Sequence, residues 1–320
     1  MHVIVFGSIN IDLVAQAPVL PRAGETVLGS SFRMTPGGKG ANQAVAVACV
    51  GVPAWLIGRV GQDAFGDLAL ASLTSAGVHT ADIVRERTTS TGVALITVAR
   101  NGENLITVAS GANARVTHTD VQRCVQRLPG AAGLLLQLEL PLAAVCAAAR
   151  AARAAGVRVI LDPAPVQPLP AALYRLCDII TPNEHEAAAL AGFPVTTRAA
   201  AMQAARLLRA RGVSIAIIKR GRHGALCMHA DGVLDVPAFP VRAVDTVAAG
   251  DAFNGGLAAA LARGATLADA VRYASATAAL SVTKHGAQEA MPTWRAVEKL
   301  LRRHARPARD PVAGHVRDTG

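Results

Sequence analysis

The sequence has few aromatic residues and no long hydrophobic run. Aromatic residues make up 3% of the 320 positions, too few for a surface that stacks nucleic-acid bases. No apolar run reaches the roughly 18 residues that a membrane-spanning helix needs, and the first residues lack the basic and apolar blocks of a signal peptide. We therefore expect a cytoplasmic protein with no nucleic-acid and no membrane partner.

Cysteine is also scarce, and its pattern excludes a disulfide framework. The five cysteines are odd in number, widely spaced and set among apolar residues, which is typical of reduced core thiols rather than of disulfides or a zinc site. They are Cys49, Cys124, Cys146, Cys177 and Cys227.

Charged residues make up 17% of the chain and hydrophobic residues 52%, so the chain can bury a large core. The formal net charge is +10. Its basic residues crowd the C-terminal end and are otherwise scattered, which indicates solvated surface charge that attracts an anionic substrate such as ATP. A basic protein that binds nucleic acid or regulates without catalysis is the alternative that this charge leaves open.

Short β-rich apolar runs alternate with alanine-rich stretches, a pattern typical of an α/β fold with a mainly parallel sheet covered by helices. The expected strands are residues 2–6, 54–60, 133–138, 157–161, 178–181 and 214–219. The expected helices are residues 40–49, 142–155, 199–211, 250–262, 267–282 and 293–304.

Two segments interrupt this alternation, residues 11–34 and 91–109. Both are β-rich, and the second contains Asn101-Gly102 between two apolar runs, which predicts a hairpin. We expect a small projecting β-sheet that closes over a ligand or pairs with another copy, because such a sheet cannot bury both faces alone. Residues 1–305 are expected to form one domain, and residues 306–320 a disordered basic tail.

The most informative segment leads from Ala248, Ala249 and Gly250 into the predicted helix that starts at residue 250. Small residues there leave backbone N–H groups open at the positive end of a helix, which favours an anion. Asp251 lies in the same turn and could accept a proton from an attacking hydroxyl. A cap of the helix N-terminus is an equally good interpretation of Asp251 from local pattern alone.

A glycine-rich turn, residues 36–44, enters another predicted helix. It lacks the spacing of a phosphate-binding P-loop, and its glycines would let the backbone approach a polyol while Lys39 and Asn42 donate hydrogen bonds. Asn10 and Asp12 follow the first strand at a spacing that points them the same way. A plain turn and an Asx turn are the structural alternatives. Glu139 follows another strand, at the edge where open α/β sheets bind ligands.

The two segments Pro36-Gly37-Gly38-Lys39-Gly40-Ala41-Asn42 and Asp245-Thr246-Val247-Ala248-Ala249-Gly250-Asp251 closely resemble the two signatures of the PfkB family of carbohydrate kinases, and the ribokinases within it. The resemblance covers nearly the whole chain. It implies a three-layer α/β/α domain with a β-sheet lid, and transfer of the ATP γ-phosphoryl group to the 5-hydroxyl of D-ribose. Asp251 would be the general base, and Ala248, Ala249 and Gly250 the anion hole. The implied sugar-binding residues are Asn10, Asp12, Gly38, Lys39, Asn42, Glu139 and Asp251.

The same resemblance implies the remaining sites. Nucleotide-binding residues would be Asn183, Lys219, Gly221, Gly224, Gly250 and Ser275. Glu186 would help to hold Mg²⁺, directly or through water. A monovalent cation, K⁺, would lie among Asp245, Val247, Ser281, Lys284, Gly286 and Ala290, mostly on main-chain oxygens. Ribokinases often carry Thr at the position of Lys219, usually Ser at that of Ala290, and often Asn or His at that of Ser275.

Two further expectations follow from the resemblance. The lids of two copies would pair into a homodimer, for which exposed strand edges give a physical motive. The alternative substrate is another small sugar or nucleoside, such as deoxyribose, a ketose or a keto-deoxy sugar acid, because one fold accepts many substrates.

Overall fold

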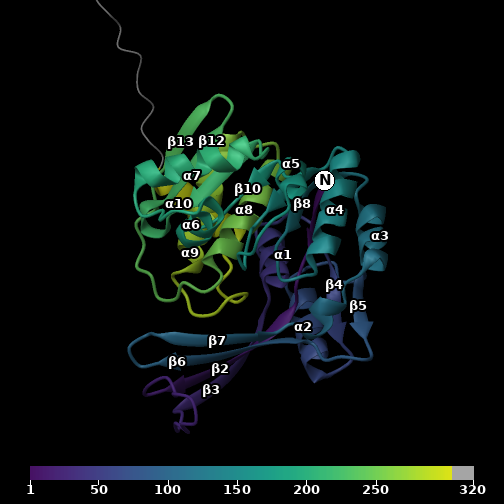
Figure 1. Ribbon diagram of the computed structural model, residues 1–320, viewed down its shortest axis with the longest axis vertical. Coiled ribbons are helices and arrows are strands. Elements are labelled where there is room, and N and C mark those ends of the chain that lie inside the picture. Colours follow the sequence, from purple (N-terminus) through teal and green to yellow (C-terminus); the bar gives the residue numbers. More distant parts are fainter. Residues whose placement is uncertain (305–320) are drawn as a thin grey trace, which may run out of the picture.

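A large, mainly parallel sheet forms the centre of the fold (Figure 1). The computed structural model describes residues 1–304, so the expected tail from residue 306 lies outside the described residues. The strands of this sheet are β1 (His2–Phe6), β4 (Ala54–Gly61), β5 (Ile83–Glu86), β8 (Ala131–Leu136), β9 (Arg158–Leu161), β10 (Ile179–Ile180), β11 (Ile215–Lys219), β12 (Ala225–His229) and β13 (Gly232–Val236). Their order is β13-β12-β11-β10-β9-β8-β1-β4-β5, and β12 and β13 pair antiparallel at one edge.

Helices cover both faces of this sheet, because successive strand residues point to opposite sides. Val3 and Val5 face one hydrophobic cluster, whereas Ile4 and Phe6 face the other. The first cluster is covered by α1 (Lys39–Cys49), α2 (Ala64–Ser75), α8 (Ala249–Ala262), α9 (Leu267–Ser281) and α10 (Trp294–Arg303). The second is covered by α3 (His118–Arg127), α4 (Leu142–Ala154), α5 (Ala171–Leu176), α6 (Glu184–Ala191) and α7 (Arg198–Ala210). The predicted three-layer α/β/α architecture is confirmed.

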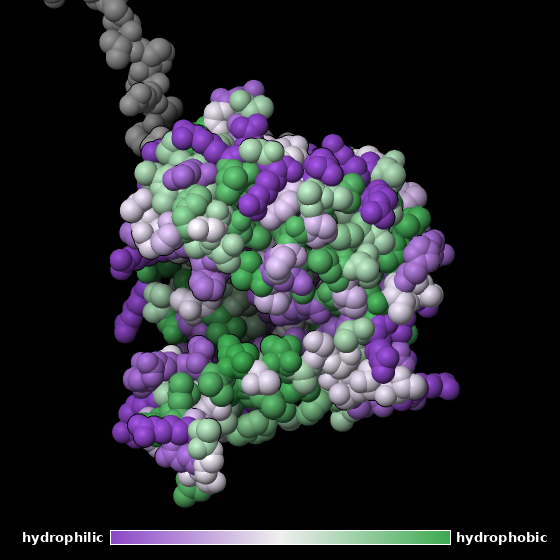
Figure 2. All heavy atoms as spheres, viewed as in Figure 1, coloured by the Kyte–Doolittle hydropathy of each residue, from purple (hydrophilic) through white to green (hydrophobic). Residues whose placement is uncertain are grey.

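A separate four-stranded sheet projects from this body, and a hollow separates the two on one face of the molecule (Figures 1 and 2). Its strands are β2 (Asn10–Ala17), β3 (Ser31–Gly37), β6 (Gly92–Ala99) and β7 (Asn104–Ala109), in the order β3-β2-β6-β7. β6 and β7 form the predicted hairpin, in which Gly102 has φ +88°. The first predicted β-rich segment was too broad, since residues 18–30 form no strand and β3 continues to Gly37.

The sequence patterns did not predict α2, α3, α5, α6, β5, β12 and β13. Several of these elements are too short to show a hydrophobic period, such as β5 with four residues and α5 with six. No helix within residues 1–304 is long and apolar enough to cross a membrane.

All five cysteines are free thiols. Cys124, Cys177 and Cys227 are buried as predicted, whereas Cys49 and Cys146 are only half-buried. Burial raises the pKa of both the Cys124 and the Cys227 thiol to about 12, so these thiols stay protonated at neutral pH.

The close crossing of α1 and α8 positions much of the candidate site described below. Gly255 allows this approach, because a Cβ there would overlap Ala46 Cβ and lie 3.0 Å from the carbonyl oxygen of Gln43. Glycine normally weakens a helix interior, so its position here reflects packing between helices.

We expect Gly255→Ala to lower the free energy of unfolding by about 1–3 kcal/mol, the usual effect of overpacking. Helix propensity alone predicts the opposite sign, a gain of up to about 1 kcal/mol. Urea unfolding followed by circular dichroism measures the change. The double variant Ala46→Gly/Gly255→Ala is the matched control and should recover part of the loss, while a single variant as stable as the wild type would contradict the packing argument.

Candidate active site

The N-terminus of α8 meets the side chains of α1 at Asp251. Asp251 Oδ2 accepts a hydrogen bond from Asn42 Nδ2 at 3.0 Å, across 209 residues of sequence. Asp251 Oδ1 accepts from Gln43 Nε2, also at 3.0 Å. The helix cap is Ala248, with φ 56° and no side-chain hydrogen bond. The interpretation of Asp251 as a helix cap is therefore wrong, because its carboxylate faces side chains of another helix.

The environment of Asp251 makes its carboxyl a stronger proton acceptor than an ordinary aspartate. Burial raises its pKa to about 6, against the opposing charge of Lys39 and the hydrogen bonds from Asn42 and Gln43, while Asp162 raises it further. A carboxyl with this pKa is mostly ionised at neutral pH and still binds a proton readily.

Glu139 follows β8 in the chain, and its side chain lies beside the first turn of α1, where it bonds to two other segments of the chain. Its Oε2 accepts hydrogen bonds from Ser8 Oγ at 2.5 Å and from the backbone N–H of Lys39 at 3.2 Å. Ser8 Oγ in turn accepts from Gly40 N at 3.3 Å. A carboxylate is favoured at this position because the first turn of a helix presents unpaired N–H groups. The structure thus brings Glu139 to the predicted glycine-rich turn.

Asn10 and Asp12 lie on one face of β2, as predicted from their spacing. Asn10 Oδ1 accepts from Asn113 Nδ2 at 2.7 Å, which leaves the amide group of Asn10 available as a donor. A Cβ on Gly37 would overlap the Asp12 carboxylate, and one on Gly38, which has φ +89°, would lie 2.7 Å from Asn10 N. These glycines therefore make room for protein atoms, whereas the sequence had suggested room for a polyol.

Asp12 and Lys39 both have shifted pKa values in this region. Burial raises the pKa of Asp12 to about 6, with Glu139 and Asp251 adding to the effect and Lys39 opposing it. Burial tends to lower the pKa of Lys39, but Asp251 and the other nearby carboxylates outweigh it, so the net shift is upward. Lys39 therefore remains a cation among carboxylates.

Asn183, a predicted nucleotide contact, is the N-cap of α6. Its Oδ1 accepts from Glu186 N at 2.8 Å, and Glu186 Oε2 accepts from Asn183 N at 2.7 Å. Asn183 Nδ2 also donates to Glu186 Oε1 at 2.9 Å. Each carboxylate oxygen of Glu186 has a lone pair left, so this residue could still hold a magnesium ion, most simply through water. Burial raises its pKa, opposed by Lys219.

Lys219 reaches the same region from the end of β11. Its Nζ forms an ion pair with Asp162 Oδ1 at 2.9 Å. A Cβ on Gly250 would lie 3.2 Å from this Nζ, so the ammonium group stands over the first turn of α8. The sequence predicted Lys219 as a nucleotide contact. In the structure its ammonium group lies at the expected anion site and pairs there with Asp162.

The other predicted nucleotide residues lie in tight turns or within a helix. Gly221 begins the short 3-10 helix η2 (Gly221–His223) and Gly224 follows it, and both glycines have positive φ. A Cβ on Gly224 would overlap the carbonyl oxygen of Val236. Ser275 is buried in α9 and donates its hydroxyl to the carbonyl of Val271 at 2.9 Å, a bond within its own helix.

The predicted cation residues come from the loop before α8 and from the end of α9 with the loop that follows it, and Asp245 joins these two segments. Asp245 Oδ1 accepts from Val247 N at 3.0 Å, and Oδ2 from Gly286 N at 3.1 Å. The backbone N–H of Lys284 lies 3.4 Å from the carbonyl oxygen of Ser281. Ala290 is buried. Backbone carbonyl oxygens are hard ligands of the kind that hard cations prefer.

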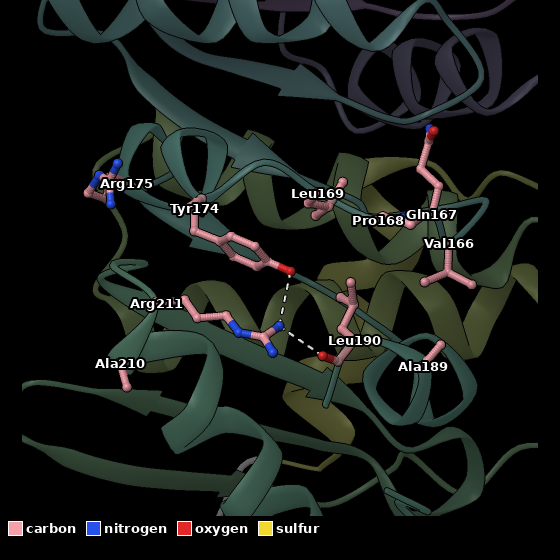
Figure 3. A pocket seen from close by; sticks show the side chains of 11 residues that line it. Val166, Gln167, Pro168, Leu169, Tyr174, Arg175, Ala189, Leu190, Ala210 and Arg211 are labelled. Atoms are coloured by element: carbon pink, nitrogen blue, oxygen red, sulfur yellow. Dashed lines mark hydrogen bonds between the residues drawn. The ribbon is translucent and has the colours of Figure 1, made fainter. Parts of the chain in front are cut away.

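Residues 1–304 contain no cluster of three or more His, Cys, Asp or Glu side chains that could hold a metal ion. A cavity of about 680 Å³ lies among α5, α6 and α7, where Arg211 Nη1 donates to Tyr174 Oη and to the carbonyl of Leu190 (Figure 3). None of the predicted site residues lines this cavity.

Sequence reasoning missed two side chains in contact with the site, Gln43 and Asp162. Gln43 Nε2 donates to both Asp162 Oδ2 and Asp251 Oδ1, at 3.0 Å each. Asp162 follows β9 at the same sheet edge as Glu139, so its position after a strand was a usable signal. Gln43 carried no signal except that it adjoins Asn42.

The chain matches a known protein family over most of its length. The model of the pfkB family carbohydrate kinases matches residues 1–294. The chain belongs to the pfkB family of carbohydrate kinases. It is 40% identical over 289 residues to the ribokinase of Haemophilus influenzae, and this alignment covers 90% of this chain and 94% of that protein. It is 37% identical over 294 residues to the deoxyribokinase of Salmonella typhi, with 92% and 96% covered.

A solved structure of a ribokinase matches the fold. Arabidopsis thaliana ribokinase, complexed with ribose and ATP, aligns with a TM-score of 0.87 at 32% identity, over 94% of this chain and 98% of that one. The predictions of a sugar kinase and of a ribokinase-like fold are therefore confirmed, and the interpretation as a non-catalytic basic protein is wrong.

Proposed function

We propose that this pfkB-family kinase transfers the γ-phosphoryl group of ATP to the 5-hydroxyl of D-ribose. The observation that carries the proposal is the 3.0 Å bond between Asn42 and Asp251, because it joins the two family signatures at one carboxylate. The similarity to ribokinases, including one complexed with ribose and ATP, supports this choice of substrates.

In the proposed reaction Asp251 is the general base. The ribose hydroxyl gives its proton to Asp251 while its oxygen forms a bond to the γ-phosphorus. The bond from that phosphorus to ADP breaks, and ADP leaves with the electron pair. The raised pKa of Asp251 supports this role because the carboxyl is ionised at neutral pH and basic enough to bind the proton.

The remaining predicted residues fall into sugar and phosphate groups. Sugar binding is assigned to Asn10, Asp12, Gly38, Lys39, Asn42 and Glu139. The backbone N–H groups of Ala248, Ala249 and Gly250 would stabilise the transferred phosphoryl charge. Nucleotide contacts are assigned to Asn183, Lys219, Gly221, Gly224, Gly250 and Ser275. Glu186 would hold Mg²⁺ through water, and this ion would offset the charge of the ATP phosphates.

Deoxyribose is the strongest alternative acceptor, because a deoxyribokinase is almost as similar to this chain as the ribokinases are. A panel of ribose, deoxyribose, fructose, 2-keto-3-deoxygluconate and inosine, each assayed for sugar-dependent release of ADP, tests the assignment. Ribose should give the highest kcat/KM, and ³¹P NMR of the product should show a 5-phosphate. A higher kcat/KM with any other compound would replace ribose as the substrate.

We expect Asp251→Asn to lower kcat for ribose phosphorylation by at least about 10²-fold, the usual range for loss of a general base. The variant removes the proton acceptor but keeps the shape of the side chain, so the Kd for ribose from calorimetry should stay near that of the wild type. Full turnover in this variant would remove Asp251 from the mechanism.

We further propose a K⁺ site at the loops joined by Asp245, namely Asp245, Val247, Ser281, Lys284, Gly286 and Ala290. Activity in potassium chloride should exceed that in tetramethylammonium chloride several-fold, because the bulky cation cannot enter the site. Asp245→Ala should abolish this difference, since its carboxylate joins the two loops. Exposed Asp231 offers the control Asp231→Ala, which should keep it. Equal wild-type rates in both salts would contradict the site.

We also propose that the small sheet pairs with that of a second copy to form a homodimer and acts as a lid. Strand register puts Leu95 and Met34 beside Leu13, on the face opposite Asp12. Leu95 and Met34 are 50% and 49% exposed. Neighbouring apolar side chains exposed on one sheet face favour a protein partner.

Sedimentation should therefore show a dimer of the wild type, and Leu95→Glu should convert it to a monomer by placing a charge in the contact. Val108→Glu is the matched control, because Val108 is 47% exposed and lies on the Asp12 face through its pairing with Ala94. A wild type that sediments only as a monomer would refute the dimer.

A further inference from the structure

The amide group of Gln43 bridges two buried carboxylates, Asp162 and Asp251. Asp162 Oδ2 and Asp251 Oδ1 each lie 3.0 Å from Gln43 Nε2, so these two oxygens are at most about 6 Å apart. Like charges at this distance shift each other's pKa. Asp162 and Asp251 are 2% and 5% exposed. Water therefore screens their interaction weakly.

Gln43 is held in the orientation that this bridge requires. Its Oε1 accepts a hydrogen bond from Gln137 Nε2 at 2.7 Å, and the whole residue is 0% exposed. The bond to its oxygen directs its nitrogen toward the two carboxylates. The distance between Asp162 and Asp251 is thus set by buried side chains of α1 and of the segment after β8.

Asp162 also has a counterion at the phosphate end of the site. Its second oxygen, Oδ1, pairs with Lys219 Nζ at 2.9 Å, and this ammonium stands over Gly250 in the first turn of α8. The Asp162 carboxylate therefore contacts Lys219 at the anion site. Through the amide group of Gln43 it is also linked to Asp251, the proposed base.

We propose that Asp162 is a positioning residue that couples the phosphoryl site to the base. It holds Lys219 over the first turn of α8, and its negative charge, transmitted across Gln43, strengthens Asp251 as a proton acceptor. A nucleotide phosphate that draws Lys219 toward itself leaves the charge of Asp162 less compensated. Asp251 then becomes more basic when the phosphoryl group has arrived. This inference rests on the proposed kinase function.

Other charged groups also affect the pKa of Asp251, and their effects must be distinguished from that of Asp162. Lys39 of α1 lowers the pKa of Asp251, and Asp12 of β2 interacts with it from the sugar side. Lys219 and Glu186 lie beyond Asp162. Asp12 and Lys39 are assigned to sugar binding, so their titration should change the affinity for ribose. The profile of kcat at saturating ribose and MgATP isolates the base in the ternary complex.

The test is the pH dependence of kcat for Asp162→Asn and Lys219→Met. In the wild type at saturating MgATP, kcat should fall with decreasing pH at a pH above about 6, the pKa of Asp251 before substrates bind, because Asp251 is more basic once the nucleotide has drawn Lys219 away. Removing the negative charge in Asp162→Asn should move this acid limb to lower pH by about one unit. Removing the positive charge in Lys219→Met should move it to higher pH by a similar amount, about one unit.

Asp178→Asn is the matched control, because Asp178 pairs with Arg153 and precedes β10 at the opposite edge of the sheet. Its acid limb should coincide with that of the wild type. Acid limbs that coincide for the wild type and both test variants would overturn the proposal. Circular dichroism checks folding, and if Asp162→Asn does not fold, the limb of Lys219→Met decides alone. A wild type without ribose-dependent ADP release would instead overturn the proposed function.

Discussion

The close approach of α1 to α8 is the constraint on which the active site depends. Gly255 permits it, and the result is that Asn42 and Gln43 reach the carboxylate of Asp251 from a helix more than two hundred residues earlier. Hydrogen bonds of this kind to a buried charge are worth more than ordinary ones, since the carboxylate has lost its water. A packing detail between two helices thus sets the orientation of the proposed base.

Burial of charge is the second constraint. Asp12, Asp162, Glu139 and Asp251 meet in a small volume, and such a group would be unstable without Lys39 and Lys219. The compensation is incomplete, so Asp12 and Asp251 keep raised pKa values. The incompletely compensated negative charge is what lets one carboxylate accept a proton. The neighbouring helix N-terminus is left to receive a polyanion.

The sequence predicted much of the fold because hydrophobic period is a local property. The six expected strands all correspond to strands of the central sheet, and the Asn101-Gly102 turn joins β6 to β7. The edge strands β5 and β13 escaped because most of their side chains are half-buried or exposed, so these strands show no apolar run. Their place is decided by the strand or helix beside which they pack.

For the site, the sequence alone determined which residue types gather in the two signatures, and hence the family, the fold and the candidate base. Only the tertiary structure decided that Asp251 does not cap its helix, that Lys219 pairs with Asp162, and that Gln43 joins Asp162 to Asp251. Local patterns encode caps and turns, which involve neighbours in sequence. Bonds between residues 57 to 209 positions apart depend on how strands and helices pack, and no local pattern records that.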